Sequence, residues 1–139
     1  MSEQTLVAED IFKNRFGEAI DPDGRKGYEG YIANRENLIE VVTALRDEFG
    51  YDYLSSVTAV DYLPEDKIEV VYHLYKSTGG SGLVIKTTAP RENTSVPSLV
   101  PVYPGADFQE REVWDLMGVK FEGHPDLRRI LMWEGFAGH

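Results

Sequence analysis

The chain has no cysteine among its 139 residues. This absence excludes disulfide bonds, a thiolate nucleophile and the usual thiolate ligands of iron–sulfur clusters. If the protein takes part in electron transfer, it does not carry the electrons on a cluster of its own. We therefore expect no cofactor in this chain.

Basic residues are also scarce. Lysine and arginine total 14 against 24 aspartate and glutamate residues, which gives a net charge of −10. A field of this sign repels phosphate backbones and anionic lipid headgroups. Nucleic-acid binding and direct electrostatic binding to a membrane are therefore not expected, while docking on a basic protein surface remains open.

Long apolar runs and familiar catalytic signatures are missing as well. No stretch approaches the roughly 20 apolar residues of a membrane-spanning helix, and the N-terminus lacks the basic start and apolar core of a signal peptide. The motifs GxSxG, GxGxxG, HExxH and the phosphate-binding P-loop are absent. These absences predict a soluble cytoplasmic protein with no catalytic residue of a familiar kind.

The chain does contain enough apolar material for one folded domain. Hydrophobic residues make up 42% of the sequence and aromatic residues 12%, which argues against global disorder. We predict a single domain over residues 1–123, followed by an extended partner-binding segment over residues 124–139.

Two amphipathic helices are predicted in the first third of the chain. One covers residues 5–16. The other covers residues 35–49, with Asn34 at its N-cap and Gly50 as its C-terminal stop. Apolar residues of this second helix recur at helical spacing and form one stripe: Leu38, Val41, Val42, Leu45 and Phe49.

Strand-like segments surround the second helix. Residues 28–33 precede it, and residues 53–63, 67–76 and 83–89 follow it, rich in β-branched and aromatic side chains. Short loops join the last three, which is typical of an antiparallel meander. The predicted fold is α+β, a mostly antiparallel sheet with a β-α-β-β-β core, helices packed on one face and an irregular C-terminal segment.

The stretch before residue 107 carries four prolines and is predicted to hold one helical turn at most. A third helix is predicted over residues 107–117, with Asp107 and Glu110 at capping-box spacing and Gly118 closing it. VKFEG then adds a short edge strand. The helix has an apolar stripe of Ala106, Val113 and Met117 with Trp114 and Leu116 at its margins, and an Arg111–Asp115 pair on the other side.

Glu110 is out of place because it lies inside that apolar stripe. A carboxylate there is costly unless it is paired or hydrogen-bonded. We predict that Glu110 is buried and anchors Arg128, Arg129 or local backbone amides. The alternative is a general acid or base with a raised pKa.

The histidines allow two interpretations. His124, Asp126 and His139 include residue types that bind zinc, but they lack a dense ligand spacing, so no metal site is predicted. His73 lies in a strand between tyrosines and is interpreted as a packed or edge residue.

The segment after His124 combines two arginines with large apolar side chains. Arg128 and Arg129 stand among Leu127, Ile130, Leu131, Met132 and Trp133. Such a set is typical of a protein–protein anchor. A solvated tail is the alternative, but this run is too apolar to lie in water without cost.

Taken together, EREVWDLMGVKFEGHPDLRRILM closely resembles the signature of the 30 kDa-type subunit of NADH:quinone oxidoreductase, respiratory complex I. YLSSVTAVDY and IEVVYHLY resemble the two central strands of that family, and VPSLVPVYPGADFQERE resembles the approach to its signature. The resemblance covers roughly residues 28–139. Family members continue past the second Gly-His, whereas this sequence ends there, so the resemblance implies a shortened C-terminal segment.

The resemblance implies a non-redox subunit of the hydrophilic arm that binds the quinone-site subunit and lies near the iron–sulfur subunits. NAD, FMN, iron–sulfur clusters and quinone then belong to partner subunits. The resemblance also implies that the complex lies on the cytoplasmic side of the cell membrane and that the isolated chain has no activity. The expected partner interface comprises Trp114, His124, Asp126, Leu127, Arg128, Arg129, Ile130, Leu131 and Trp133.

Two alternatives remain. Related subunits occur in membrane-bound nickel–iron hydrogenases and other quinone-linked dehydrogenases. A stand-alone enzyme would use Glu110, Asp126 and His124 as acid–base groups.

Overall fold

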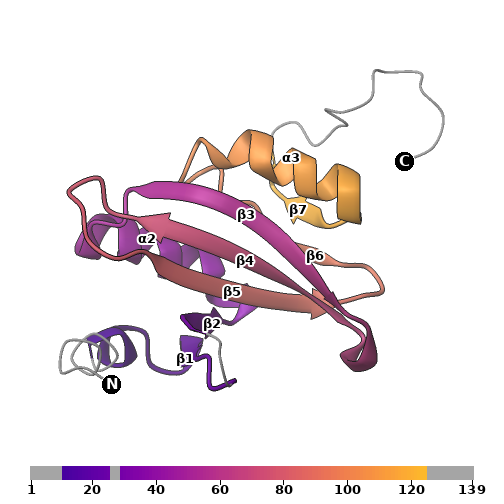
Figure 1. The fold of residues 1–139 in the computed structure, drawn as a ribbon, viewed down its shortest axis with the longest axis horizontal. Coiled ribbons are helices and arrows are strands. Elements are labelled where there is room, and N and C mark those ends of the chain that lie inside the picture. The colour runs from indigo at the N-terminus through magenta and orange to yellow at the C-terminus, as the bar shows by residue number, and fades with distance from the viewer. Residues whose placement is uncertain (1–10, 26–28, 125–139) are drawn as a thin grey trace.

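The computed structural model describes residues 11–25 and 29–124. Residues 11–16 are helical, which matches the described part of the first predicted helix. The elements after it are η1 (Gly17–Ala19), β1 (Ile20–Pro22), β2 (Tyr31–Ala33), η2 (Arg35–Asn37), α2 (Leu38–Phe49), β3 (Tyr53–Tyr62), η3 (Leu63–Glu65), β4 (Lys67–Tyr75), β5 (Leu83–Pro90), β6 (Ser95–Pro97), α3 (Ala106–Met117) and β7 (Lys120–Glu122) (Figure 1).

The main sheet has five strands in the order β1-β2-β5-β4-β3. Strands β3, β4 and β5 pair antiparallel in chain order, so the predicted meander is confirmed. Strand β2 pairs in parallel with β5. Parallel strands need a long connection, which helix α2 and the β3–β4 hairpin provide. The mixed but mostly antiparallel sheet confirms the α+β class.

Helix α2 has the expected core stripe and is preceded by the 3₁₀ turn η2. The apolar side chains of α2 join the main hydrophobic cluster with those of the sheet. Asn34 is the N-cap residue of η2, the 3₁₀ turn that leads directly into α2, so its predicted position is confirmed. Its side chain makes no capping hydrogen bond, because its amide donates to the Glu18 carbonyl at 3.2 Å instead. Gly50 ends the helix as predicted, in the left-handed conformation with φ 81°.

Two short strands do not follow from the sequence pattern. Strand β1 was not predicted. Its Ile20 is buried at 2% exposure, and the strand pairs antiparallel with β2. Strand β6 lies in the proline-rich stretch and pairs in parallel with β7 as a separate two-stranded sheet. The predicted strand VKFEG is therefore present as β7, although it does not join the main sheet.

The predicted helical turn before α3 is present. The Leu99 carbonyl accepts hydrogen bonds from the amides of Val102 and Tyr103, at 2.9 and 2.7 Å. Leu99 is fully buried, so this turn contributes to the core.

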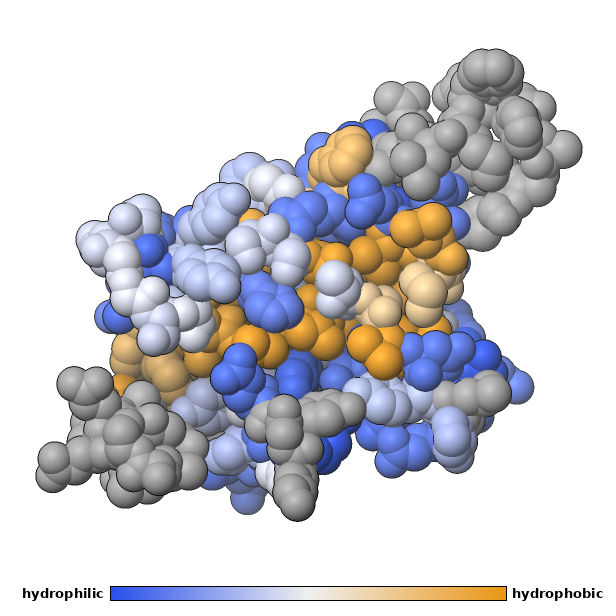
Figure 2. All heavy atoms as spheres, in the orientation of Figure 1, coloured by the Kyte–Doolittle hydropathy of each residue, from blue (hydrophilic) through white to orange (hydrophobic). Residues whose placement is uncertain are grey.

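The sheet presents an open face opposite the helices. Because side chains alternate along a strand, Tyr72 and Ile85 enter the core while Val60, Val71 and Val84 lie on the open face. Figure 2 shows hydrophobic atoms as a band across the strands between hydrophilic margins. None of the helices within the described residues combines the length and low polarity that a bilayer crossing requires.

Candidate functional site

Helix α3 carries the first part of the signature and packs against β3. It begins after Gly105 without a side-chain cap, so the predicted capping box is wrong. Gly118 ends it in the left-handed conformation with φ 74°, as predicted. Its core side buries Ala106, Glu110 and Val113.

Glu110 is completely buried, which agrees with its place in the apolar stripe. The Ser98 hydroxyl donates to Glu110 Oε1 at 2.6 Å, and the Leu99 amide donates to Oε2 at 2.7 Å. The carboxyl group thus ties α3 to the turn after β6, through a local backbone amide of the kind predicted as one of its possible partners.

The surroundings of Glu110 raise its pKa on balance. Burial raises the pKa of Glu110, while the hydrogen bonds from Ser98 and Leu99 and the nearby His124 act in the opposite direction. The hydroxyl of Tyr72 is also buried, and no hydrogen-bond partner of it lies within the described residues. Burial and then the charge of Glu110 raise the pKa of Tyr72.

His124 lies beside this carboxyl group at the end of the described chain. Its side chain is 0% exposed, and its Nε2 atom is 4.0 Å from Glu110 Oε1. The same Nε2 lies 3.1 Å from the backbone carbonyl of Asp107. A carbonyl oxygen can only accept, so Nε2 carries the proton and donates to it. His124 therefore fixes the start of the C-terminal segment against the first turn of α3.

The side chains of α3 differ from the helical-wheel prediction in three respects. Arg111 Nε lies 3.1 Å from Asp107 Oδ1, so Arg111 pairs towards the N-terminus and the predicted Arg111–Asp115 pair is wrong. Asp115 is 9% exposed, and its Oδ1 has no hydrogen-bond partner within the described residues. Met117 is 38% exposed instead of buried in the stripe, because it lies in the last turn next to Gly118.

Large apolar side chains are left in solvent on α3. Phe108 is 54% exposed and Leu116 is 67% exposed. Trp114 is partly buried and packs against the hydrophobic core. The helix therefore buries two acidic residues of the signature, Glu110 and Asp115, while part of its apolar surface faces outward.

The remaining predicted interface residues lie outside the described part of the chain: Asp126, Leu127, Arg128, Arg129, Ile130, Leu131 and Trp133. His139 of the alternative metal set also lies outside it. Within residues 11–25 and 29–124, no group of three or more histidine, cysteine, aspartate or glutamate residues could hold a metal ion. The assignment of the interface residues, and the boundary at residue 124, stay predictions.

His73 lies on the open face of β4 and is partly buried. The Ser56 hydroxyl lies 3.0 Å from its Nδ1 atom. This position fits the interpretation of His73 as a packed strand residue.

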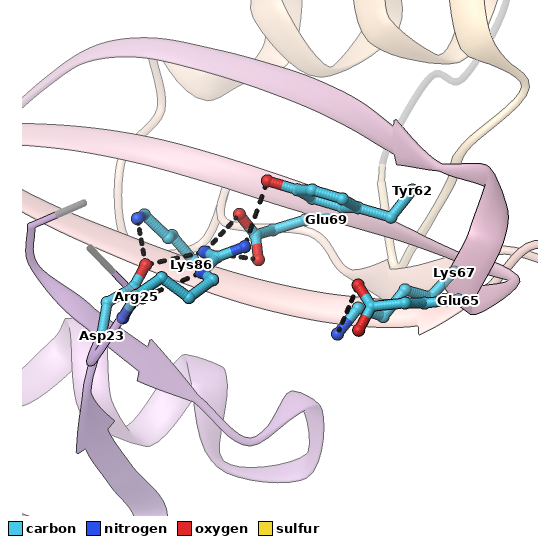
Figure 3. A network of polar contacts seen from close by, with 7 residues as sticks. All are labelled: Asp23, Arg25, Tyr62, Glu65, Lys67, Glu69 and Lys86. Atoms are coloured by element: carbon cyan, nitrogen blue, oxygen red, sulfur yellow. Dashed lines mark hydrogen bonds and ion pairs between the residues drawn. The ribbon is translucent and has the colours of Figure 1, made fainter. Parts of the chain in front are cut away.

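A second charged cluster, which was not predicted from the sequence, lies on the open face of the sheet (Figure 3). The Arg25 guanidinium group contacts Asp23 at 2.7 Å, Glu69 at 3.1 Å and the hydroxyl of Tyr62 at 3.1 Å. The Lys86 ammonium group also donates to Asp23. The hydrogen bonds from Arg25 hold the pKa of Asp23 well below its usual range, and the hydrogen bond from Lys86 adds to the effect.

One signal in the sequence was available for this cluster. Glu69 and Lys86 each interrupt a run of β-branched and apolar residues in a central strand. A charge at such a position needs an opposite charge nearby. The partner Asp23 is 63 residues from Lys86, so no local pattern could identify it.

Comparison with known proteins gives one family over most of the chain. Residues 31–139 match the family model for the respiratory-chain NADH dehydrogenase 30 Kd subunit. An NADH-quinone oxidoreductase subunit of Moorella thermoacetica is 44% identical over 108 residues, 78% of this chain and 73% of that protein. The corresponding protein of Phenylobacterium zucineum is 48% identical over 103 residues, 73% of this chain but only 49% of that protein.

Solved structures share the fold. The trypsin-resistant fragment of Nqo5 is 29% identical, with a TM-score of 0.69 over 91% of this chain and 100% of that chain. A chain of the membrane-bound sulfane sulfur reductase, an archaeal respiratory membrane complex, has a TM-score of 0.79 over 94% of this chain and 77% of that chain. This second likeness, at 23% identity, shows the fold alone.

Proposed function

Since the chain belongs to the family of the respiratory-chain NADH dehydrogenase 30 Kd subunit, we propose that it is a non-redox scaffolding subunit of an NADH:quinone oxidoreductase. In this proposal, α3 and residues 124–133 bind the quinone-site subunit next to the iron–sulfur subunits. NAD, FMN, iron–sulfur clusters and quinone are bound by partner subunits. The chain is held at the cytoplasmic side of the membrane only through the complex.

The proposal rests on the burial and the contacts of Glu110 and His124, the acid and the histidine of the signature. Glu110 and His124 have fully buried side chains, and they hold α3, the Ser98 turn and the start of the C-terminal segment together. A general acid or base must reach a proton on its substrate. A side chain at 0% exposure does not meet that condition, whereas it does fix the geometry of a binding surface.

The exposed side of α3 supports the same conclusion. Phe108 and Leu116 present apolar surface that a partner can bury, which is the usual source of affinity at an interface. Arg128 and Arg129 follow in the sequence and supply charges that orient a partner. The absence of cysteine is consistent with a subunit that carries no iron–sulfur cluster.

The proposal is tested by assembly in the native host with a tagged chain. The Arg128→Glu/Arg129→Glu variant is expected to lower the amount of quinone-site subunit that co-purifies by at least roughly tenfold. Lys13→Glu/Arg15→Glu changes the net charge equally at the opposite end of the sequence and serves as the matched control. Its expected result is normal co-purification.

The opposite outcomes are also defined. Normal assembly of the Arg128/Arg129 variant with lost turnover assigns these arginines to the chemistry instead of the interface. Turnover by the isolated chain contradicts the scaffolding role itself.

An equivalent subunit of another membrane-bound complex is the second candidate, because the archaeal reductase contains a chain of this fold. The cofactors of the co-purified partner distinguish the candidates. Flavin and an NADH-oxidising subunit support the first candidate, and a nickel–iron or sulfur-reducing partner supports the second.

A further inference from the structure

A cleft of about 610 Å³ opens at the C-terminal end of α3. Three segments that are distant in the sequence form its walls: the turn between β3 and β4, residues 91–94 after β5, and the end of α3 with β7. Neither the signature carboxyl group of Glu110 nor the charged cluster of the open face is among its lining residues.

One wall of the cleft is apolar and exposed. Leu116 and Met117 line it with 67% and 38% of their surface in solvent, and the side of Trp114 continues it towards the core. Exposed apolar side chains beside a concave surface are typical of protein-binding sites.

The opposite rim is acidic. Asp61 and Arg91 neutralise each other through two hydrogen bonds of 2.8 and 3.0 Å. The carboxylates of Asp66 and Glu92 are exposed, and neither has an ion-pair partner within the described residues. Lys120 is the other lining cation. The lining therefore holds more acid than base, in a chain whose net charge is −10.

Hydrogen bonds inside the rim hold it in shape. Asp66 adopts the left-handed conformation with φ 55°, and its carbonyl accepts from the Arg91 amide at 3.1 Å. The Thr94 hydroxyl donates to the carbonyls of Pro90 and Arg91 at 2.8 and 3.0 Å. A rim that is fixed before binding loses little conformational entropy when a partner docks.

We propose that this cleft is a docking site for a segment of a partner subunit that presents a lysine or arginine next to an apolar side chain. The apolar side chain packs on Leu116 and Met117, and the cation lies between Asp66 and Glu92. The inference rests on the proposed function, because the partner is a subunit of the same complex. It adds a contact that is separate from the arginine-containing segment after His124.

The contact is identified by cross-linking in the assembled complex. A photoreactive phenylalanine analogue replaces Leu116, whose exposure allows the substitution without disturbing the core. The expected product joins residue 116 to a partner-subunit peptide that contains lysine or arginine. Cross-links only to a second copy of this chain, or only to this chain's own C-terminal segment, overturn the inference.

The role of the acidic rim is tested with charge-removing variants. Asp66→Asn keeps a residue that tolerates the left-handed conformation, and Glu92→Gln is close in shape. The double variant is expected to co-purify roughly tenfold less partner at low salt, with a weaker dependence on salt than the wild type. Glu36→Gln/Glu40→Gln removes the same charge from exposed positions around the start of α2 and is the matched control, with no expected change.

The two proposals fail in different ways. If the wild-type chain does not assemble with any quinone-site subunit, the proposed function fails. If it assembles, and the cleft and control variants do so equally, the scaffolding role stands and the docking site alone is wrong.

Discussion

Two buried carboxyl groups lie on opposite sides of the same sheet, and they are stabilised in different ways. Glu110, on the core side, accepts hydrogen bonds from the neutral Ser98 hydroxyl and Leu99 amide. Asp23, on the open face, accepts from the cationic Arg25 and Lys86 side chains. Accordingly, burial raises the pKa of Glu110, whereas the hydrogen bonds from Arg25 lower the pKa of Asp23.

The comparison shows that the neighbours of a buried acid determine the direction in which its pKa shifts. Neutral donors satisfy the oxygens of Glu110 but do not offset the full cost of burying a negative charge. The cations Arg25 and Lys86 do offset that cost for Asp23. Their ion pairs fix the segment before β2 against Glu69 of β4 and Lys86 of β5. The hydrogen bonds of Glu110 join residues 11 and 12 positions apart, whereas Asp23 and Lys86 are 63 positions apart.

The largest expected loss of stability comes from breaking the charged cluster. Asp23→Ala leaves Lys86, whose side chain is 7% exposed, without the Asp23 carboxylate. We expect the free energy of unfolding in urea to fall by about 4 kcal/mol, since a buried charge loses this acceptor. Asp21→Ala is the control, because the Asp21 side chain is 74% exposed and pairs at the surface with Lys13. Similar losses in both variants contradict the assigned role of Asp23.

A slightly smaller loss is expected at the other carboxyl group. Glu110→Ala removes the acceptor of the Ser98 hydroxyl and the Leu99 amide and leaves a cavity. The expected decrease in unfolding free energy is about 3 kcal/mol. Glu112→Ala, at an exposed position of the same helix, is the control. An unchanged urea midpoint for Glu110→Ala shows that the carboxyl group does not hold α3 in place.

The two acids are expected to give pH effects of opposite sign. The pKa of Glu110 is raised on folding, so its favourable contribution is complete below its unfolded pKa near 4.5 and is lost as the pH rises through the folded value. The pKa of Asp23 is lowered, so its contribution is present above its unfolded pKa near 3.8 and is lost as the pH falls.

This difference is measured with two non-titrating variants. The stability of the wild type relative to Glu110→Gln is expected to decrease from acidic to neutral pH. Its stability relative to Asp23→Asn is expected to increase over the same range. Urea unfolding at a series of pH values gives both differences, and slopes of the same sign remove the distinction between the clusters.

The smallest effect is expected at Tyr72. Its buried hydroxyl has no hydrogen-bond partner within the described residues. Tyr72→Phe is therefore expected to change the free energy of unfolding by less than about 0.5 kcal/mol, because no hydrogen bond is lost. Tyr51→Phe is a control at a half-buried tyrosine. A large loss at Tyr72 indicates a contact of the hydroxyl that contributes to the Glu110 cluster.

Much of the fold was predictable because its strongest signals are local. The apolar stripe of α2, the left-handed glycines Gly50 and Gly118, and the short loops of the meander each depend on a few neighbouring residues. The short strands β1 and β6 were not predicted because each ends in a proline, a residue that argues against a strand. Their pairing is decided by burial of Ile20 and by contact with the distant strand β7.

The side-chain partners on α3 were less predictable than the helix itself. Spacing alone allowed Arg111 to pair with Asp115 or with Asp107, and only the folded helix shows the contact with Asp107. The capping-box spacing of Asp107 and Glu110 was equally misleading, because the Ser98 turn offers Glu110 better donors inside the core.

The sequence by itself determined the α+β class, the burial of Glu110 and the family of the chain. Periodicity indicates the fold class, the apolar stripe around an acid indicates its burial, and the long signature indicates the family. All three are properties of residues that lie close together in the sequence. The tertiary structure alone decided which groups surround each buried acid. Lys86 meets Asp23, and Ser98 meets Glu110, only after the strands and helices have packed. The direction of the pKa shift of a buried acid depends on these neighbours, and the spacing of residues along the chain does not give their distances in space.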